Sequence, residues 1–192
     1  MRIAKATLMS RWGWCTGLAL GVFAILLALD LRLKALTGVS TADLASFSSP
    51  LQFRAAFIAW NAQPNAIRAG FDLGFDYLLM PLYAASFFYS GIIAAEGLAP
   101  RPGLLRRIIL MAAMAPLVGA AADAAENALQ ITMLLSGVTD TLVFLSSSAS
   151  NVKNLALLIG LALLLGAIVA RVQQRRMSRG PGNSGPKTPG LS

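Results

Sequence analysis

Four long apolar stretches constrain this chain more than any other feature of its sequence. They cover residues 14–36, 71–95, 108–136 and 151–170. A helix needs about 20 residues, at about 1.5 Å each, to cross the roughly 30 Å hydrocarbon layer of a bilayer. The stretches lack the short alternation of polar and apolar residues that is typical of barrel strands. The sequence therefore predicts an all-α, polytopic membrane protein, with four transmembrane helices in an antiparallel bundle.

The composition agrees with this class of protein. Of the 192 residues, 56% are hydrophobic and only 12% are charged, which is too apolar for the surface of a soluble domain of this size. The net charge of +8 comes from basic residues that flank the apolar stretches and form no stripe with interleaved aromatics. Lipid head groups explain such a charge, so the bilayer is the expected partner and nucleic acid is not. Protein partners and an oligomeric state are not specified.

The distribution of Lys and Arg predicts the orientation. Basic residues are frequent in residues 1–13, in the connection around Arg106 and in residues 171–192, whereas the third connection carries only Asp140. By the positive-inside rule, both termini and the second connection are cytoplasmic, and residues 14–170 form the membrane domain. The last segment is rich in Gly, Pro and Ser, so we expect a disordered basic tail.

The first outer connection, residues 37–70, contains a short helical pattern. Phe53, Phe57 and Trp60 follow Ser49-Pro50 at i, i+4 and i+7 spacing, which predicts one apolar face on a helix that begins at Pro50. One interpretation is an amphipathic helix lying on the outer membrane surface. A second is a connector packed on the bundle. A lid over a polar site is the third.

Small residues indicate where helices approach one another. Gly17 with Gly21 and Gly70 with Gly74 form two pairs with four-residue spacing, and Gly119 lies in an alanine-rich stripe of the third stretch. Such residues permit close contact between membrane helices. We expect all three positions to serve packing.

Polar residues of the four predicted helices share one depth. Converting sequence offset to height at about 1.5 Å per residue places them roughly 3 to 15 Å on the outer side of the bilayer centre. Asp123, Glu126 and Asn127 also share one helix face. A charged residue near the centre costs about 2.5 kcal/mol or more, so these intramembrane carboxylates should face each other or a wet cavity. The candidate polar site comprises Asp30, Asp72, Asp76, Tyr77, Tyr83, Asp123, Glu126, Asn127, Ser150, Lys153 and Asn154.

The carboxylates of this layer outnumber Lys153, its only cation that cannot easily reach the surface. Either some carboxyl groups hold protons or a cation binds among them. A bound hard cation would take Asp76, Asp123 and Glu126 as ligands, and no other cofactor is predicted. The chain has no His and one Cys, which excludes imidazole metal sites, Ser/His triads and dithiol chemistry.

Three interpretations of the polar layer stay open. It is a structural network that fixes which helices meet. It binds or transports a proton, a cation or a cationic small molecule from the outer side. It is the site of a small membrane enzyme acting on a lipid or isoprenoid, with Asp76 and Glu126 as an acid/base or metal-binding pair. No residue is assigned a catalytic role, and the sequence favours a protein that is not an enzyme.

Three segments carry a resemblance to a known group of proteins. They are FDYLLMPLY at residues 75–83, ADAAEN at residues 122–127 and the SxxKN pattern from Ser150 to Asn154. In this order they resemble small uncharacterised bacterial four-helix integral membrane proteins. The resemblance implies the topology and the bundling of these residues, and it implies a bacterial inner membrane as the location. It implies no activity.

Overall fold

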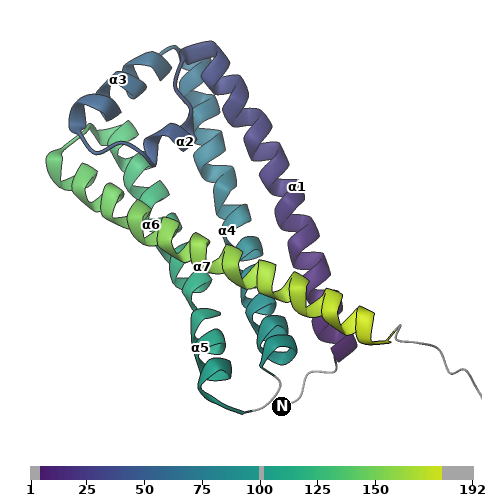
Figure 1. Ribbon diagram of the computed structural model, residues 1–192. Coiled ribbons are helices and arrows are strands. Elements are labelled where there is room, and N and C mark those ends of the chain that lie inside the picture. Colours follow the sequence, from purple (N-terminus) through teal and green to yellow (C-terminus); the bar gives the residue numbers. More distant parts are fainter. Residues whose placement is uncertain (1–4, 100–101, 179–192) are drawn as a thin grey trace, which may run out of the picture.

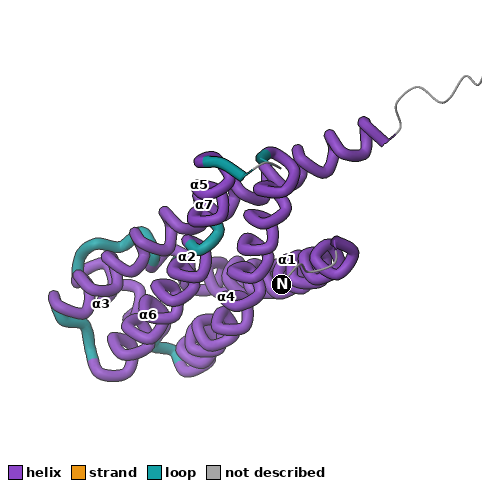
Figure 2. The backbone as a smooth tube through the Cα atoms, turned by 90° about the horizontal axis from the view of Figure 1, so that it is seen from below, coloured by secondary structure: helices purple, strands orange, loops and turns teal. Residues whose placement is uncertain are grey.

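The structure is a computed structural model that describes residues 5–99 and 102–178, and every regular element in these ranges is a helix (Figure 1). Short loops join the helices (Figure 2). The helices are α1 (Lys5–Thr37), α2 (Thr41–Leu44), α3 (Pro50–Trp60), α4 (Gln63–Leu98), α5 (Leu104–Ala112), α6 (Ala115–Ser136) and α7 (Asp140–Ser178). Within the described ranges, four segments are long and apolar enough to cross a membrane: α1, α4, α5 with α6, and α7. The predicted all-helical chain with four such segments is confirmed.

The helices are longer than the apolar stretches that predicted them. Helix α1 begins at Lys5, inside the predicted N-terminal tail, and α7 begins at Asp140 and continues to Ser178. Residues 171–178 of the tail expected to be disordered are therefore helical, while residues 1–4 and 179–192 lie outside the described ranges. The third stretch is interrupted between α5 and α6, where Pro116 occupies the first turn of α6. Proline has no amide hydrogen to donate to the carbonyl four residues earlier, at Ala112, and its ring crowds that carbonyl, which explains why α5 ends there.

Helix α3 forms after Ser49-Pro50, where the sequence places its start. Ser49 caps the helix in a reciprocal pair with Gln52. Its predicted aromatic face is turned towards the bundle, since Phe53 and Trp60 are fully buried. They share one apolar core with the neighbouring ends of the long helices, consisting of Leu33, Leu44, Phe53, Ala56, Trp60, Ala69, Met133 and Val143. Helix α3 is thus packed on the bundle.

Helix α4 is the centre of the bundle and contacts α1, α6 and α7. Helices α1 and α7 meet near the start of α1, where Leu8 and Ala167 share a buried cluster and the Arg171 guanidinium lies 5.5 Å from the Trp12 ring centre. Towards the end of the molecule that carries α2 and α3, the two helices diverge (Figure 1). A side of the bundle is therefore left open between them.

Close helix contact occurs at only one of the three expected groups of small residues. A Cβ atom added to Gly119 would lie 2.6 Å from the Cβ of Ala156, so this glycine lets α6 approach α7. A Cβ atom on Gly17, Gly21, Gly70 or Gly74 would meet nothing within 4 Å. The expectation that these four glycines serve helix packing is wrong for the described fold, because their faces meet no neighbouring helix.

Candidate functional site

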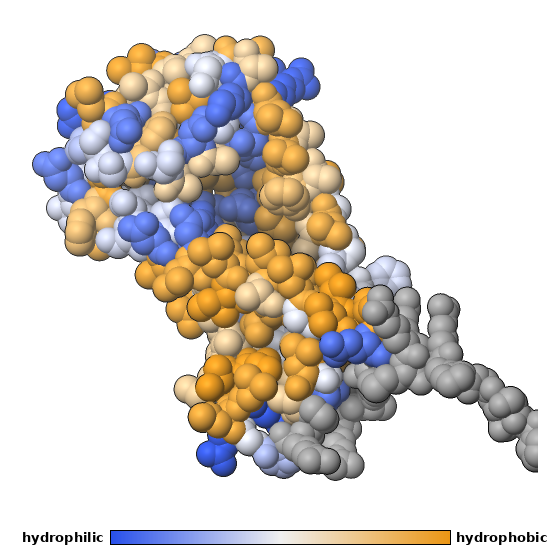
Figure 3. All heavy atoms as spheres, viewed as in Figure 1, coloured by the Kyte–Doolittle hydropathy of each residue, from blue (hydrophilic) through white to orange (hydrophobic). Residues whose placement is uncertain are grey.

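A cavity of about 700 Å³ lies between α1, α4, α6 and α7, with α2 at one end. This volume is within the roughly 300–1,000 Å³ range of small-molecule sites. Figure 3 shows it as a hydrophilic hollow beside the apolar surface of α1 and above that of α7. Leu20 and Phe23 of α1 and Leu161 of α7 line the cavity and are also exposed. The cavity therefore opens sideways, between two helices that are apolar enough to face lipid.

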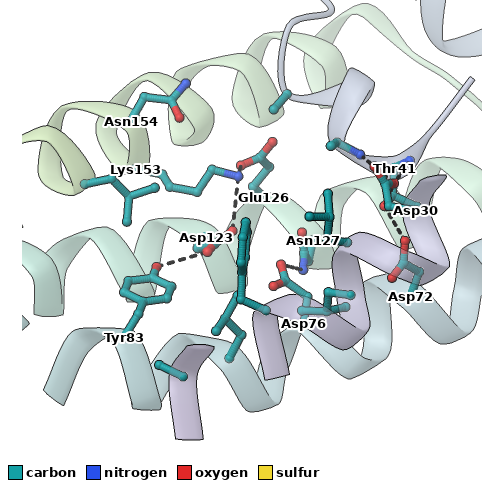
Figure 4. Close-up of a pocket in the computed structure, with 18 of the residues that line it drawn as sticks. Asp30, Thr41, Asp72, Asp76, Tyr83, Asp123, Glu126, Asn127, Lys153 and Asn154 are labelled. Carbon is teal, nitrogen blue, oxygen red and sulfur yellow. Dashed lines mark hydrogen bonds and ion pairs between the residues drawn. The ribbon is translucent and has the colours of Figure 1, made fainter. Parts of the chain in front are cut away.

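The structure brings most of the predicted site residues to this cavity (Figure 4). Tyr77 and Ser150 do not line it: the Tyr77 hydroxyl donates to the carbonyl of Ala124 at 2.9 Å, and the Ser150 hydroxyl donates to that of Ala45 at 3.0 Å. Both act between elements of the fold. The lining residues among the candidates are Asp30, Asp72, Asp76, Tyr83, Asp123, Glu126, Asn127, Lys153 and Asn154.

Lys153 of α7 and two carboxylates of α6 form a closed network. The ammonium lies 3.2 Å from Asp123 Oδ1 and 2.5 Å from Glu126 Oε2. Those two oxygens accept no hydrogen bond, so the ammonium is their partner. The other two oxygens accept hydrogen bonds, one from the Tyr83 hydroxyl at 3.0 Å and one from Gln130 Nε2 at 2.9 Å. Every oxygen of both carboxylates is satisfied, as expected for a polar network that stabilises the contact between helices.

Thr41 of α2 bridges two further carboxylates. Its hydroxyl oxygen lies 2.7 Å from Asp30 Oδ1 and 2.7 Å from Asp72 Oδ2. A hydroxyl has one hydrogen, so Thr41 can donate to only one of the two carboxyl groups at a time. Asp30 Oδ1 also accepts from the amides of Thr41 and Ala42 at 2.8 and 3.2 Å. Asp30 Oδ1 therefore has donors besides the Thr41 hydroxyl, whereas Asp72 Oδ2 has that hydroxyl alone.

Asp72 and Asp76 each keep one oxygen without a partner. Asn127 Nδ2 donates to Asp76 Oδ2 at 2.9 Å and to the Leu73 carbonyl at 3.2 Å, which uses both of its hydrogens. Within the described residues, nothing donates to Asp76 Oδ1 or Asp72 Oδ1, and the latter belongs to a side chain that is only 3% exposed. The two residues are four apart and share one face of α4. The spare Asp72 oxygen is enclosed by protein, so Asp76 Oδ1 is the spare acceptor that lies at the cavity.

Helix α2 closes one end of the cavity and is held from several sides. Its residues Thr41, Ala42 and the following Ala45 line the cavity. Lys34 of α1 pairs with Asp43 at 2.8 Å, on the side of α2 exposed to solvent. Burial raises the pKa of Asp43, but the hydrogen bonds from Lys34 and Ser40 outweigh burial and bring the pKa below its ordinary value of 3.8. Helix α2 thus forms a roof over one end of the cavity, and these contacts hold it in place.

Sequence reasoning missed Thr41 and Gln130 as cavity residues. A signal existed for each. Ser40 and Asp43 form a capping box around α2, and the Ser-x-x-Asp pattern in the sequence marks such a helix start. Gln130 follows Glu126 by four residues, which places both on one face of α6. At the far end of the cavity, the hydroxyls of Thr16 and Ser86 lie 2.7 Å apart, and no pattern in the sequence indicated that contact.

Within residues 5–99 and 102–178, no group of three or more His, Cys, Asp or Glu side chains is arranged to hold a metal ion. The three ligands expected for a hard cation have different partners. Asp123 and Glu126 are paired with Lys153, whereas Asp76 accepts a hydrogen bond from Asn127. Comparison with known protein families, with curated proteins and with solved structures finds no match to the chain.

Proposed function

We propose that this chain is a multi-pass protein of a bacterial inner membrane. Its four long apolar segments cross the bilayer alternately as an antiparallel bundle, with both termini in the cytoplasm. The basic connection between α4 and α5 and the acidic start of α7 support this orientation. Helices α2 and α3 then lie at the periplasmic side, where the exposed Leu51 and Ile58 of α3 reach the outer interface of the bilayer.

We further propose that the cavity binds a cation or a cationic small molecule. The observation that carries this proposal is the spare oxygen of Asp76, which faces the cavity without a donor among the described residues. Five carboxylates line the cavity against one ammonium, that of Lys153. A bound cation supplies the missing positive charge and the missing donors in a site of low dielectric constant.

Two other interpretations are less well supported. A purely structural layer would use the hydrogen-bonding capacity of all its buried groups, as the Lys153 network does, whereas Asp72 leaves a buried oxygen without a donor. An enzyme with Asp76 and Glu126 as an acid/base pair needs both groups available. Glu126 is 1% exposed and engaged by Lys153 and Gln130. Binding needs no such pair.

The experiment is a comparison of Asp76→Asn with Asp140→Asn. The first variant keeps an acceptor for Asn127 and removes the cavity charge, while Asp140 is an exposed residue outside the cavity. Thermal unfolding of the purified protein in nanodiscs is followed during titration with alkylammonium ions of increasing chain length. We expect at least one of these cations to raise the Tm of the natural sequence and of Asp140→Asn, and to leave Asp76→Asn unchanged.

The structural interpretation makes the opposite prediction for the same variants. Asp76→Asn should then lower the Tm, and no cation should stabilise any of the three proteins in an Asp76-dependent way. Under our proposal, the unliganded Asp76→Asn protein is at least as stable as the natural sequence. The carboxylate of Asp76 repels those of Asp123 and Glu126, and no cation of the described residues lies within ion-pair distance of it. Removing its charge therefore removes a repulsion without breaking an ion pair.

A further inference from the structure

We propose that the ligand is an amphiphile with a primary ammonium head and a hydrocarbon tail, taken up sideways from the bilayer. This inference rests on the proposed function and names the class of ligand that the same cavity accepts. Three features carry it: the acceptor atoms on α4, the apolar walls that lead away from them, and the opening between α1 and α7.

The acceptor atoms define the head group. Asp76 Oδ1 of α4 has no partner among the described residues and lies at the cavity, whereas the unpartnered Asp72 Oδ1 one turn away is enclosed by protein. What this end of the cavity lacks is therefore N–H donors as well as positive charge. A primary ammonium has three N–H groups and supplies both. A quaternary ammonium supplies charge alone, so it should bind less tightly. An uncharged or anionic head would leave the carboxylates uncompensated.

The walls define the tail. From the acidic end, the cavity continues along α1 from Asp30 to Thr16, a length of roughly 21 Å for 14 residues at about 1.5 Å each. Its sides there are mainly aliphatic and aromatic, with the paired hydroxyls of Thr16 and Ser86 at the far end. The apolar side chains are Ala19, Leu20, Phe23, Leu26, Leu27, Leu79, Phe87, Leu157, Leu161 and Leu164. A small hydrophilic cation would leave most of this surface uncovered, whereas a hydrocarbon chain buries it.

The opening defines the route. Helices α1 and α7 are joined at one end through Leu8, Ala167 and the Arg171–Trp12 contact, and they diverge towards the acidic end (Figure 1). The roof made by α2 is tied to α1 and α4 by Thr41 and to α7 by Ser150. Helix α2 thus covers this end of the cavity, while the side between α1 and α7 is open (Figure 3). A molecule already dissolved in the bilayer reaches the cavity without passing through water.

The test uses the full chain in nanodiscs of phosphatidylcholine, whose quaternary ammonium has no N–H group to compete. The probes are dodecylammonium, ethylammonium, dodecyltrimethylammonium and dodecanol, compared by their effect on the Tm at equal amounts per lipid. Leu161→Trp fills the tail region of the cavity, and Leu158→Trp is its matched control on α7, exposed and outside the lining. Asp76→Asn removes the head contact.

We expect dodecylammonium to bind at least tenfold more tightly than the other three probes. Asp76→Asn and Leu161→Trp should each weaken its binding about tenfold, and Leu158→Trp should not. A dodecylammonium analogue with a photoreactive group in its tail should label residues of α1 and α7 that line the cavity.

The outcomes separate the two proposals. If ethylammonium binds as well as dodecylammonium and both depend on Asp76, the cation site stands and the amphiphile is wrong. If dodecanol binds as well as dodecylammonium, or if Asp76→Asn and Asp140→Asn respond alike to every probe, the cation site itself is wrong and the inference falls with it. Equal effects of Leu161→Trp and Leu158→Trp overturn the tail path alone.

Discussion

At the scale of single residues, the partner of a carboxylate decides its role. Asp123 and Glu126 share Lys153 and have every oxygen satisfied. Asp72 and Asp76 face the same cavity and each retain an unused oxygen. Residue type is the same in both pairs. The first pair holds α6 to α7, whereas in the second pair the unused oxygen of Asp72 is enclosed and that of Asp76 lies at the cavity.

Replacing Lys153 by Met should destabilise the protein strongly. The methionine has a similar length and removes the ammonium that compensates two carboxylates which are 4% and 1% exposed. Breaking a buried ion pair by removing one member costs about 3–5 kcal/mol. We expect a loss of about 3 kcal/mol in the free energy of unfolding, because some of the cost is relieved when a carboxyl group takes up a proton. Equilibrium unfolding in mixed micelles measures it.

Lys34→Met is the matched control for this substitution. Lys34 also pairs with one carboxylate, Asp43, but half of its side chain is exposed. Surface pairs are worth about 0–1 kcal/mol, so this variant should remain close to the natural sequence. Adding Glu126→Gln to Lys153→Met should restore part of the lost stability. Equal losses in the free energy of unfolding for Lys153→Met and Lys34→Met would show that the buried network stabilises the protein no more than an exposed ion pair does.

At the scale of helices, apolar length predicted the four long segments because each must carry enough hydrophobic surface to cross a bilayer. Hydropathy alone could not predict how far α7 extends, since its first turns contain Asp140 and several serines that hydropathy does not assign to a span. Asp76, Asp123 and Lys153, which the depth argument placed at one level, line the same cavity. Depth says nothing about rotation around a helix axis, so it could not exclude Tyr77.

Glycine patterns show the same limit. Four-residue spacing marks a smooth helix face, but whether another helix lies against that face depends on the bundle. In this fold Gly119 meets Ala156 of α7, and Gly74 meets nothing. The difference arises from tertiary arrangement, which no local pattern contains.

Gly119→Ala should therefore destabilise the contact between α6 and α7. The new Cβ would lie 2.6 Å from that of Ala156, so the two helices must separate. Overpacking of this kind costs about 1–3 kcal/mol. Since Lys153 lies one turn before Ala156 on α7, separation should also lengthen its ion pairs. Unfolding in mixed micelles measures the loss in stability.

Gly74→Ala is the control for the steric effect. It makes the same chemical change inside a long helix where no atom lies within 4 Å of the new Cβ. Alanine has the higher helix propensity, by about 1 kcal/mol, so the variant should be as stable as the natural sequence or slightly more so. A loss at Gly119 no larger than at Gly74 would contradict the close approach of α6 and α7.

At the scale of the whole molecule, the cavity is placed towards one end of the bundle. Thr41 bridges two of its carboxylates, and the core beneath α3 closes the same end. The opposite end holds the start of α1, the basic α5 and the later part of α7. The polar site and most of the positive charge thus lie at opposite ends. In a bilayer, the orientation of the chain decides which leaflet supplies the ligand.

Single cysteines should report this orientation. In a Cys15→Ser background, Asp140→Cys tests the connection before α7, and Gly103→Cys tests the connection before α5; both positions are exposed. Gly103 has extended backbone, which any residue adopts. The positive-inside rule predicts that a membrane-impermeant maleimide labels Asp140→Cys in intact cells and labels Gly103→Cys only after permeabilisation. The reverse pattern would place the cavity in the cytoplasmic half. Binding of the ammonium head to Asp76 would then be unaffected, because the carboxylate oxygens of α4 recognise the head in either orientation, but the ligand would come from the inner leaflet.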